Sequence, residues 1–416
     1  LDASNSVAGG EQLLTTANAA ILYELNSGSM VYSWNPDVML DPSGMNKIMT
    51  ALLALENGDP ESTVTVTRTA LSSLEIGALT AGLLADEEIS LRDLLYCMMV
   101  GSANDAAAVI AEYIAGSQTT FVEMMNSRAK ELGCTNTVFL NPSGLSQEGQ
   151  YSTARDLAKI TAAALEREDF CEYFSAEIYT VAATNKSPER QLVTTNFLAS
   201  KETMSNFFDE RVTGGKTGAF TTTDRSLICT AEGNDVRYLS VVMGAQGTRE
   251  TTLSLFANFK ETIALLDIGF GNYALRRLLT TDQVLERFSV TDGENDVAVA
   301  SASEIYVMMP KEMENGKVSY RCIQNSSAIE APLPSGQPVG TVQVWYDALC
   351  VAQADLVAMH SVGKEGENNL PLSTKAVSTD GESMKNTFLI IAIVVLTLGL
   401  ILGTVITLRR SHGTKR

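Results

Sequence analysis

The chain has 416 residues, of which 45% are apolar, and that is enough for two or three domains with sizeable cores. Its formal net charge of −19 excludes the basic surface expected of a nucleic-acid-binding protein. The two histidines are His360 and His412, so no histidine base and no histidine metal ligand precedes residue 360. A hydrolytic site in that region must therefore take its base from lysine, a carboxylate or tyrosine.

The first part of the chain combines strand-like and helix-like segments. Two apolar runs on either side of a glycine-containing turn at 26–29 predict a β-hairpin. Predicted helices cover 47–56, 91–100, 105–115, 153–167 and 258–270, and predicted strands cover 226–231 and 237–243. Strands at both ends with helices between them predict an α/β (α+β) layered domain over residues 15–277, behind a loose leader at 1–14.

After about residue 278 the pattern changes to short strand-like pieces divided by proline, glycine and asparagine. These pieces cover 297–300, 305–309, 318–323, 340–346 and 349–359. They predict a small all-β domain over 278–360. The polar residues at 361–386 then read as a linker.

Residues 387–408 are uncharged and apolar over about the length of a helix that crosses a bilayer. A buried core helix is the alternative, but the segment follows a polar linker. The tail at 409–416 has four basic and no acidic residues, so we expect it in the cytoplasm and the main domains outside the cell. We therefore expect a single-pass cell-membrane protein whose chain begins after a cleaved secretion signal.

The six cysteines do not have the spacing of a zinc site. Cys322 and Cys350 lie in strand-like segments of one small region, so they are the pair best placed for a disulfide, with free thiols as the alternative. Cys97 and Cys229 lie in apolar runs and are expected to be buried thiols.

Three short motifs with polar and basic side chains follow one another along the first domain. They are Pro-Ser-Gly-Met-Asn-Lys at 42–47, Ser-Ala-Asn at 102–104 and Lys-Thr-Gly at 216–218. Each alone is a weak signal. Their order and spacing resemble the Ser-x-x-Lys, Ser-x-Asn and Lys-Thr-Gly set of penicillin-binding proteins and serine β-lactamases. That chemistry uses a lysine base, which agrees with the missing histidines.

Further stretches resemble the D-alanyl-D-alanine carboxypeptidases, which are low-molecular-mass penicillin-binding proteins. They lie at 47–56, 100–107, 139–145, 151–158 and 196–198 and in the strand-like region after 305, so the resemblance covers about residues 15–360. It implies a penicillin-binding-protein/β-lactamase-like transpeptidase fold and a C-terminal β domain. It also implies peptidoglycan stem peptides ending in D-Ala-D-Ala as substrates, trapping by β-lactams where a nucleophile is present, and no metal or other cofactor.

The same resemblance assigns roles to residues of the three motifs. The residues concerned are Lys47, Ser102, Asn104, Lys216, Thr217 and Gly218. The first lysine would be the base, and the Ser-x-Asn pair would relay a proton and hold the substrate amide. A Lys-Thr-Gly on an edge strand would attract a terminal carboxylate and offer main-chain hydrogen bonds. We expect these motifs around one cleft, shaped further by a turn at 141–145.

One departure from the family pattern concerns the nucleophile. The family has serine three residues before the lysine, where this chain has Gly44, and Ser43 stands one position earlier. On a helix, Ser43 and Lys47 share a face. A step of one residue nevertheless turns a side chain by about 100° and moves it by about 1.5 Å. Ser43 is therefore either a helix N-cap or an inert residue, which we favour, or a substitute nucleophile.

Three functions are consistent with this pattern. The first is a membrane-anchored serine-type D-Ala-D-Ala carboxypeptidase with Lys47 as base. The second is a catalytically silent relative that still binds stem peptides, and the third is a scaffold in cell-wall assembly. Reaction with a fluorescent penicillin separates the first from the others, and a peptide titration separates the second from the third.

Overall fold

The computed structural model describes residues 14, 16–72, 74, 77–204, 206–219, 224–247 and 255–366. Within these residues, no helix is both long enough and apolar enough to cross a bilayer. The predicted leader at 1–14 lies outside them except for Leu14. The predicted membrane helix at 387–408, the tail at 409–416 and residues 367–386 of the predicted linker also lie outside them.

The N-terminal part is built on a five-stranded antiparallel sheet with the order β2-β1-β9-β8-β7. Its strands are β1 (Ala19–Glu24), β2 (Ser29–Trp34), β7 (Val212–Ala219), β8 (Asp224–Gly233) and β9 (Val236–Gln246). The pairing of β1 with β2 confirms the hairpin predicted around 26–29. Because β7 is at one edge of this sheet, its outer side can line a site.

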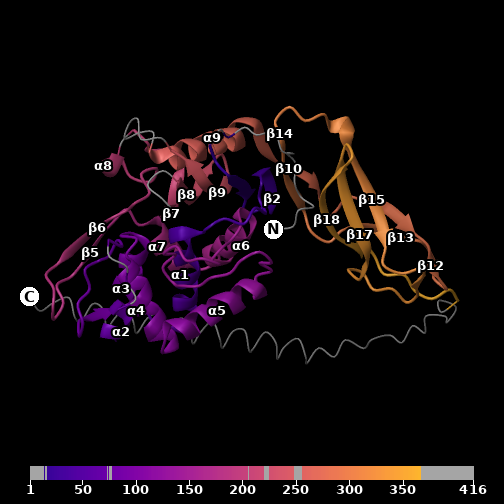
Figure 1. Cartoon of the computed structure of the whole chain (residues 1–416). Coiled ribbons are helices and arrows are strands. Elements are labelled where there is room, and N and C mark those ends of the chain that lie inside the picture. Colours follow the sequence, from indigo (N-terminus) through magenta and orange to yellow (C-terminus); the bar gives the residue numbers. More distant parts are fainter. Residues whose placement is uncertain are drawn as a thin grey trace, which may run out of the picture. The chain divides into compact units, whose positions relative to one another are not determined.

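The sheet has a hydrophobic core on each face. Successive side chains of a strand point to opposite faces, so Ile21 and Ile228 join the core under the helical layer. Leu22 and Leu227 join the core on the other face, which is covered by α9 (Ala257–Asn272). Figure 1 shows α9 lying along β8 and β9, with the other long helices gathered on the opposite side.

The helical layer surrounds α1 (Asn46–Asn57), whose residues from Asn46 to Leu55 are all buried. The other helices are α2 (Arg68–Ser72), α3 (Leu91–Met99), α4 (Asn104–Ala115), α5 (Gln118–Glu131), α6 (Ala154–Leu165), α7 (Glu168–Ser175) and α8 (Lys201–Met204). Five of them pack against α1, namely α3, α4, α5, α6 and α7. The structure confirms the five predicted helices as α1, α3, α4, α6 and α9. The small strands here are β3 (Thr63–Thr65), β4 (Glu88–Ser90), β5 (Ile178–Val181) and β6 (Arg190–Val193).

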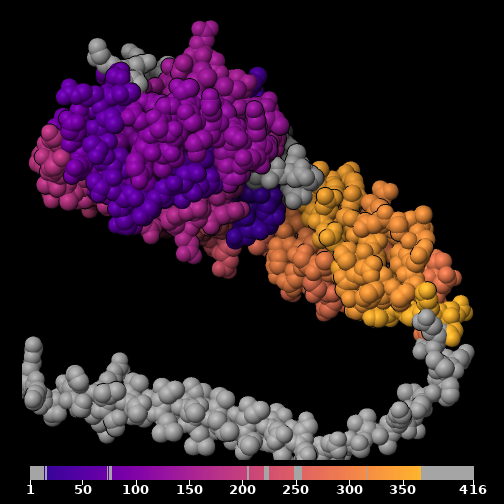
Figure 2. All heavy atoms as spheres, turned by 90° about the horizontal axis from the view of Figure 1, so that it is seen from below, coloured from indigo at the N-terminus to yellow at the C-terminus, as the bar shows by residue number. Residues whose placement is uncertain are grey.

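The C-terminal part is all β, as predicted. Its strands are β10 (Tyr273–Leu279), β11 (Glu286–Phe288), β12 (Val290–Thr291), β13 (Val297–Ser301), β14 (Ile305–Pro310), β15 (Val318–Gln324), β16 (Ile329–Glu330), β17 (Pro338–Tyr346) and β18 (Leu349–Ala358). Five of them form a sheet with the order β11-β13-β18-β17-β15 over a valine-rich core. In Figure 2 its orange atoms gather in a body of their own.

All six cysteines are free thiols, so the disulfide considered between Cys322 and Cys350 is absent. Cys322 lies on β15 and Cys350 on β18, and β17 lies between these two strands. Two interstrand spacings come to roughly 10 Å, which is beyond the Cα separation of about 7 Å that a disulfide spans. Cys97 and Cys229 are buried, as expected, and burial raises the pKa of Cys97 to about 12.

Candidate active site

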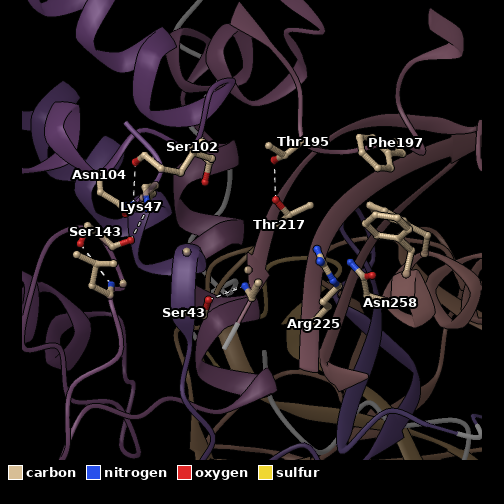
Figure 3. A pocket seen from close by; sticks show the side chains of 18 residues that line it. Ser43, Lys47, Ser102, Asn104, Ser143, Thr195, Phe197, Thr217, Arg225 and Asn258 are labelled. Carbon is tan, nitrogen blue, oxygen red and sulfur yellow. Dashed lines mark hydrogen bonds between the residues drawn. The ribbon is translucent and has the colours of Figure 1, made fainter. Parts of the chain in front are cut away.

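A pocket of about 310 Å³ lies between the start of α1, the connection from α3 to α4 and the outer edge of β7 (Figure 3). All three sequence motifs contribute to it. The predicted residues that line it are Ser43, Gly44, Lys47, Ser102, Asn104, Thr217 and Gly218. The turn at 141–145 contributes three more residues, so the expected groove-shaping role of this turn agrees with the structure. Lys216 reaches the pocket through its contact with Ser102.

Lys47 lies in the first turn of α1, and its side chain is buried. Its Nζ donates to Asn104 Oδ1 at 2.8 Å and to the carbonyl oxygen of Ser143 at 2.5 Å. Burial lowers the pKa of Lys47 well below its usual value, and the charge of Lys216 lowers it further, while Asp105 opposes the shift. A lowered pKa favours the neutral amine, which is the form that accepts a proton as a general base.

Lys216 lies on β7 with its side chain also buried. Its Nζ donates to Ser102 Oγ at 2.9 Å and to the carbonyl oxygen of Thr217 at 3.3 Å. Burial lowers the pKa of Lys216 to about 7. Ser102 has a φ of +56°, a left-handed conformation that is uncommon outside glycine. Such backbone strain persists where the surroundings hold a residue in place, and here it aims Ser102 at Lys216.

Asn104 begins α4 and connects the base to a surface loop. Its Nδ2 and its backbone N–H both donate to the carbonyl oxygen of Leu79 at 2.9 Å. The neighbouring Asp105 accepts from the backbone N–H groups of Ala81 and Leu83. These bonds hold the loop at 77–84 against the start of α4 and leave Asn104 Oδ1 facing Lys47.

Ser43 does not act as the predicted N-cap. The N-cap position of α1 is Met45, which makes no side-chain capping bond, and Ser43 belongs to a short 3₁₀ turn ahead of the helix. Its φ is +52°, and its Oγ accepts a hydrogen bond from the backbone N–H of Ala219 at 2.6 Å. Within the described part of the chain, its hydroxyl makes no hydrogen bond to Lys47. Figure 3 shows the Ser43 side chain turned toward β7 and away from the lysine.

Gly44 is in close contact with β7. A Cβ on Gly44 would lie 2.8 Å from the carbonyl oxygen of Thr217, closer than real Cβ atoms come to a backbone oxygen. On the other side, the carbonyl oxygen of Ser43 approaches Gly144, which has a φ of +79°, so closely that a Cβ there would overlap it. Residues 43 and 44 are therefore packed tightly between β7 and the turn at 141–145.

The sequence did not single out several side chains at the other end of the pocket. Arg225, at the start of β8, places its guanidinium carbon 4.7 Å from the centre of the Phe256 ring. The hydroxyls of Thr195 and Thr217 share a hydrogen bond of 2.6 Å. Asn258 is 1% exposed, and its Oδ1 has no hydrogen-bond partner within the described structure. Arg225, Phe256 and Asn258 lie outside the three motifs, so the motifs give no signal for them.

The ionisable side chains around the pocket are all basic. Lys47 and Arg225 line it, Lys216 lies directly behind Ser102, and no acidic side chain is among its described lining residues. In a chain with a net charge of −19, this local excess of cations is the reverse of the average surface. Such a pocket favours a ligand that carries a carboxylate.

Comparison with known proteins agrees with this fold and site. The family model described as "D-alanyl-D-alanine carboxypeptidase" matches residues 7–247, and that of "Penicillin-binding protein 5, C-terminal domain" matches residues 273–364. D-alanyl-D-alanine carboxypeptidase DacF of Bacillus subtilis is 30% identical over 85% of this chain and 88% of its own length. DacC of Escherichia coli is 30% identical over 84% of this chain and 85% of its own length.

Among solved structures, penicillin binding protein 5 from Haemophilus influenzae matches with a TM-score of 0.70 and 28% identity. The match covers 86% of this chain and all of that one. The molecule thus has a penicillin-binding-protein-like α/β fold with a C-terminal all-β domain. The chain belongs to the D-alanyl-D-alanine carboxypeptidase family, whose serine-type members act on peptidoglycan stem peptides and bind β-lactams.

Proposed function

We propose that this protein is a catalytically silent member of its family, held at the outer face of the cell membrane, which binds stem peptides ending in D-Ala-D-Ala without forming an acyl-enzyme. The observation that carries the proposal is the nucleophile position. It is Gly44, and the amine that would activate a hydroxyl there is bound instead to Asn104 and Ser143.

The peptide-binding half of the proposal depends on the cations. A peptide ending in D-alanine carries a free carboxylate, which two basic side chains can attract: Arg225, which lines the pocket, and Lys216, which lies behind Ser102. The hydroxyl of Thr217 on β7 bonds to that of Thr195 and can make a further hydrogen bond to the ligand. Phe197 and Phe256 also line the pocket and provide apolar surface for alanine methyl groups.

The proposed lack of catalysis depends on the geometry of the site. An acyl-enzyme needs an oxygen nucleophile placed to within a fraction of an ångström, and a misplacement of about 1 Å costs roughly a hundredfold in rate. The nearest hydroxyl in the chain sequence, that of Ser43, is bound to β7 and has no hydrogen bond to Lys47 in the described structure. We therefore favour binding over turnover, with an active carboxypeptidase that uses Ser43 as the competing outcome.

The test measures affinity and turnover on the same protein. The purified protein is titrated calorimetrically with a short peptide ending in D-Ala-D-Ala, and release of D-alanine is followed over several hours. We expect saturable binding and no release of D-alanine above the rate without protein. Release that saturates with peptide and is abolished in Ser43→Ala would establish Ser43 as the nucleophile instead.

Two variants show where the peptide binds. Lys216→Met and Arg225→Met should each weaken binding by about tenfold, because each removes a charge-assisted hydrogen bond to the carboxylate. A peptide amidated at its C-terminus should bind the native protein as weakly as the carboxylate peptide binds the variants. No affinity for either peptide would leave the scaffold as the better account.

A further inference from the structure

The outer edge of β7 has two backbone groups that face the pocket. In an antiparallel edge strand, alternate residues turn their N–H and C=O groups away from the neighbouring strand. Here Ala219 directs its N–H at Ser43 Oγ, and Thr217, two residues earlier, directs its carbonyl oxygen at Gly44. An extended ligand that adds to a sheet edge uses backbone groups of this kind.

Both groups are already covered by the chain itself. The N–H of Ala219 donates to the hydroxyl of Ser43 at 2.6 Å, and Ser43 is only 3% exposed. The carbonyl oxygen of Thr217 lies against Gly44, with no room for even a Cβ between them. We propose that Ser43 is an internal ligand of the β7 edge, which occupies the Ala219 N–H and so prevents it from binding and polarising the carbonyl group of a stem peptide or a β-lactam.

Several contacts hold Ser43 in this position. Its backbone N–H donates to Asp41 Oδ1 at 2.7 Å, and Asp41 Oδ2 in turn accepts from Ser146 at 2.9 Å. Its carbonyl oxygen is packed against Gly144, and its φ of +52° is the conformation that turns the hydroxyl toward β7. The side chain is therefore fixed from both flanks rather than free to swing into the pocket.

The inference deepens the proposed function, on which it rests, by naming what the site can still recognise. The hydroxyl of Ser43 occupies the N–H of Ala219 and leaves the attraction of a carboxylate by Lys216 and Arg225 unchanged. The position next to Ala219, where the carbonyl oxygen of a ligand would accept a hydrogen bond, is occupied by the Ser43 hydroxyl. The site would thus bind the terminal carboxylate of a peptide while giving no help to attack on its carbonyl carbon.

The test restores a nucleophile and compares its reactivity with and without the Ser43 hydroxyl. Gly44→Ser is paired with Ser43→Ala/Gly44→Ser, so the crowding of a new Cβ against Thr217 is the same in both. Each is treated with a fluorescent penicillin, and the second-order rate of covalent labelling is measured. In this reaction the new serine Oγ bonds to the β-lactam carbonyl carbon, the ring C–N bond breaks, and the hydroxyl proton ends on the ring nitrogen.

We expect the double variant to be labelled about a hundredfold faster than Gly44→Ser, because one backbone or side-chain donor to a developing oxyanion is worth roughly that much. Ser326→Ala/Gly44→Ser is the control, since it removes a hydroxyl of the C-terminal part that bonds to Ala328 and takes no part in holding Ser43, and it should match Gly44→Ser. Equal labelling of single and double variants would overturn the inference, and so would an absence of labelling in both.

A second measurement needs no covalent step. Ser43→Ala in the otherwise native chain should bind the D-Ala-D-Ala peptide about fivefold more tightly, because the freed N–H gains a ligand hydrogen bond. Thermal melts confirm that each variant is folded. If the native protein binds the peptide and Ser43→Ala binds it no better, the inferred role of Ser43 is wrong and the proposed function stands. If neither binds it but the two labelling rates still differ, the proposed function fails and the role of Ser43 stands.

Discussion

Lys216 is the residue whose ionisation most directly controls the pocket. Its ammonium group is buried against Ser102, and burial lowers its pKa to about 7. Below that pH the side chain is charged and attracts a carboxylate, and above it the free protein loses this charge. Arg225 stays charged throughout this range, since a guanidinium does not lose its proton in proteins.

Peptide affinity should therefore fall as the pH rises from 6 to 9. The carboxylate of the ligand is ionised over the whole range, so the change comes from the protein. We expect the dissociation constant to rise by at most about tenfold for each pH unit above 7, because binding then requires the uptake of one proton. Calorimetric titrations at several pH values measure this slope. Lys216→Met should show weak binding that is flat over this range, and the same slope in that variant would contradict the role of Lys216.

The sequence predicts which residues form the site far better than it predicts how their side chains are oriented. Lys47, Ser102 and Lys216 could be named because their motifs resemble the Ser-x-x-Lys, Ser-x-Asn and Lys-Thr-Gly set, and the two lysines agree with the lack of histidine before residue 360. The orientation of Ser43 depends on the N–H of Ala219, which is distant in the chain, and on a positive φ that is rare for serine. No local pattern reports either one.

At the scale of elements, the β5–β6 hairpin positions one wall of the pocket. β6 is followed directly by Thr194 and Thr195, and Thr195 bonds to Thr217 on β7. The hairpin is held by an ion pair between Arg190 and Glu87, whose closest atoms are 2.7 Å apart. The Glu87 side chain is 0% exposed and that of Arg190 is 13% exposed.

Arg190→Ala should lower the free energy of unfolding by about 3 kcal/mol, because it leaves a buried carboxylate without its counter-ion. Urea denaturation measures this change. Arg92→Ala is the control, since its ion pair with Glu61 is largely solvent-exposed and should contribute about 1 kcal/mol or less. Equal losses in the two variants would show that burial does not decide the effect.

Elements with a wide apolar face were predictable, and those with a narrow one were not. Within α5 the buried residues are Phe121, Met125 and Ala129, one every four positions, so its sequence reads as mostly polar. β5 and β6 have four residues each, too few for a period of two to stand out. The broad apolar stripes of α3 and α6 were recognised, and their ends agree to within about two residues.

For the whole molecule, the family assignment and the membrane anchor rest on different observations. The family follows from matches that together cover most of the chain from residue 7 to residue 364. The anchor is proposed from the uncharged apolar run at 387–408 and the basic residues after it. The β-rich part, which ends close to residue 360, leaves a polar stretch before that run, as a tether would require.

We expect the full chain to remain with the membrane fraction after extraction with alkaline carbonate, because a helix of this length and hydropathy does not leave a bilayer. A chain ended at residue 366 should appear in the soluble fraction with an unchanged thermal melt. Release of the full chain by carbonate would contradict the anchor, and it would leave the account of the pocket intact.

The central claim is that the site binds without reacting, and intact-protein mass spectrometry tests it most directly. The native protein is incubated with excess benzylpenicillin for several hours, and its mass is measured under denaturing conditions. Because position 44 has no hydroxyl and Ser43 is bound to Ala219, we predict a mass unchanged from that of the untreated protein. A stoichiometric increase equal to one penicillin, located by peptide mapping to Ser43, would contradict the account.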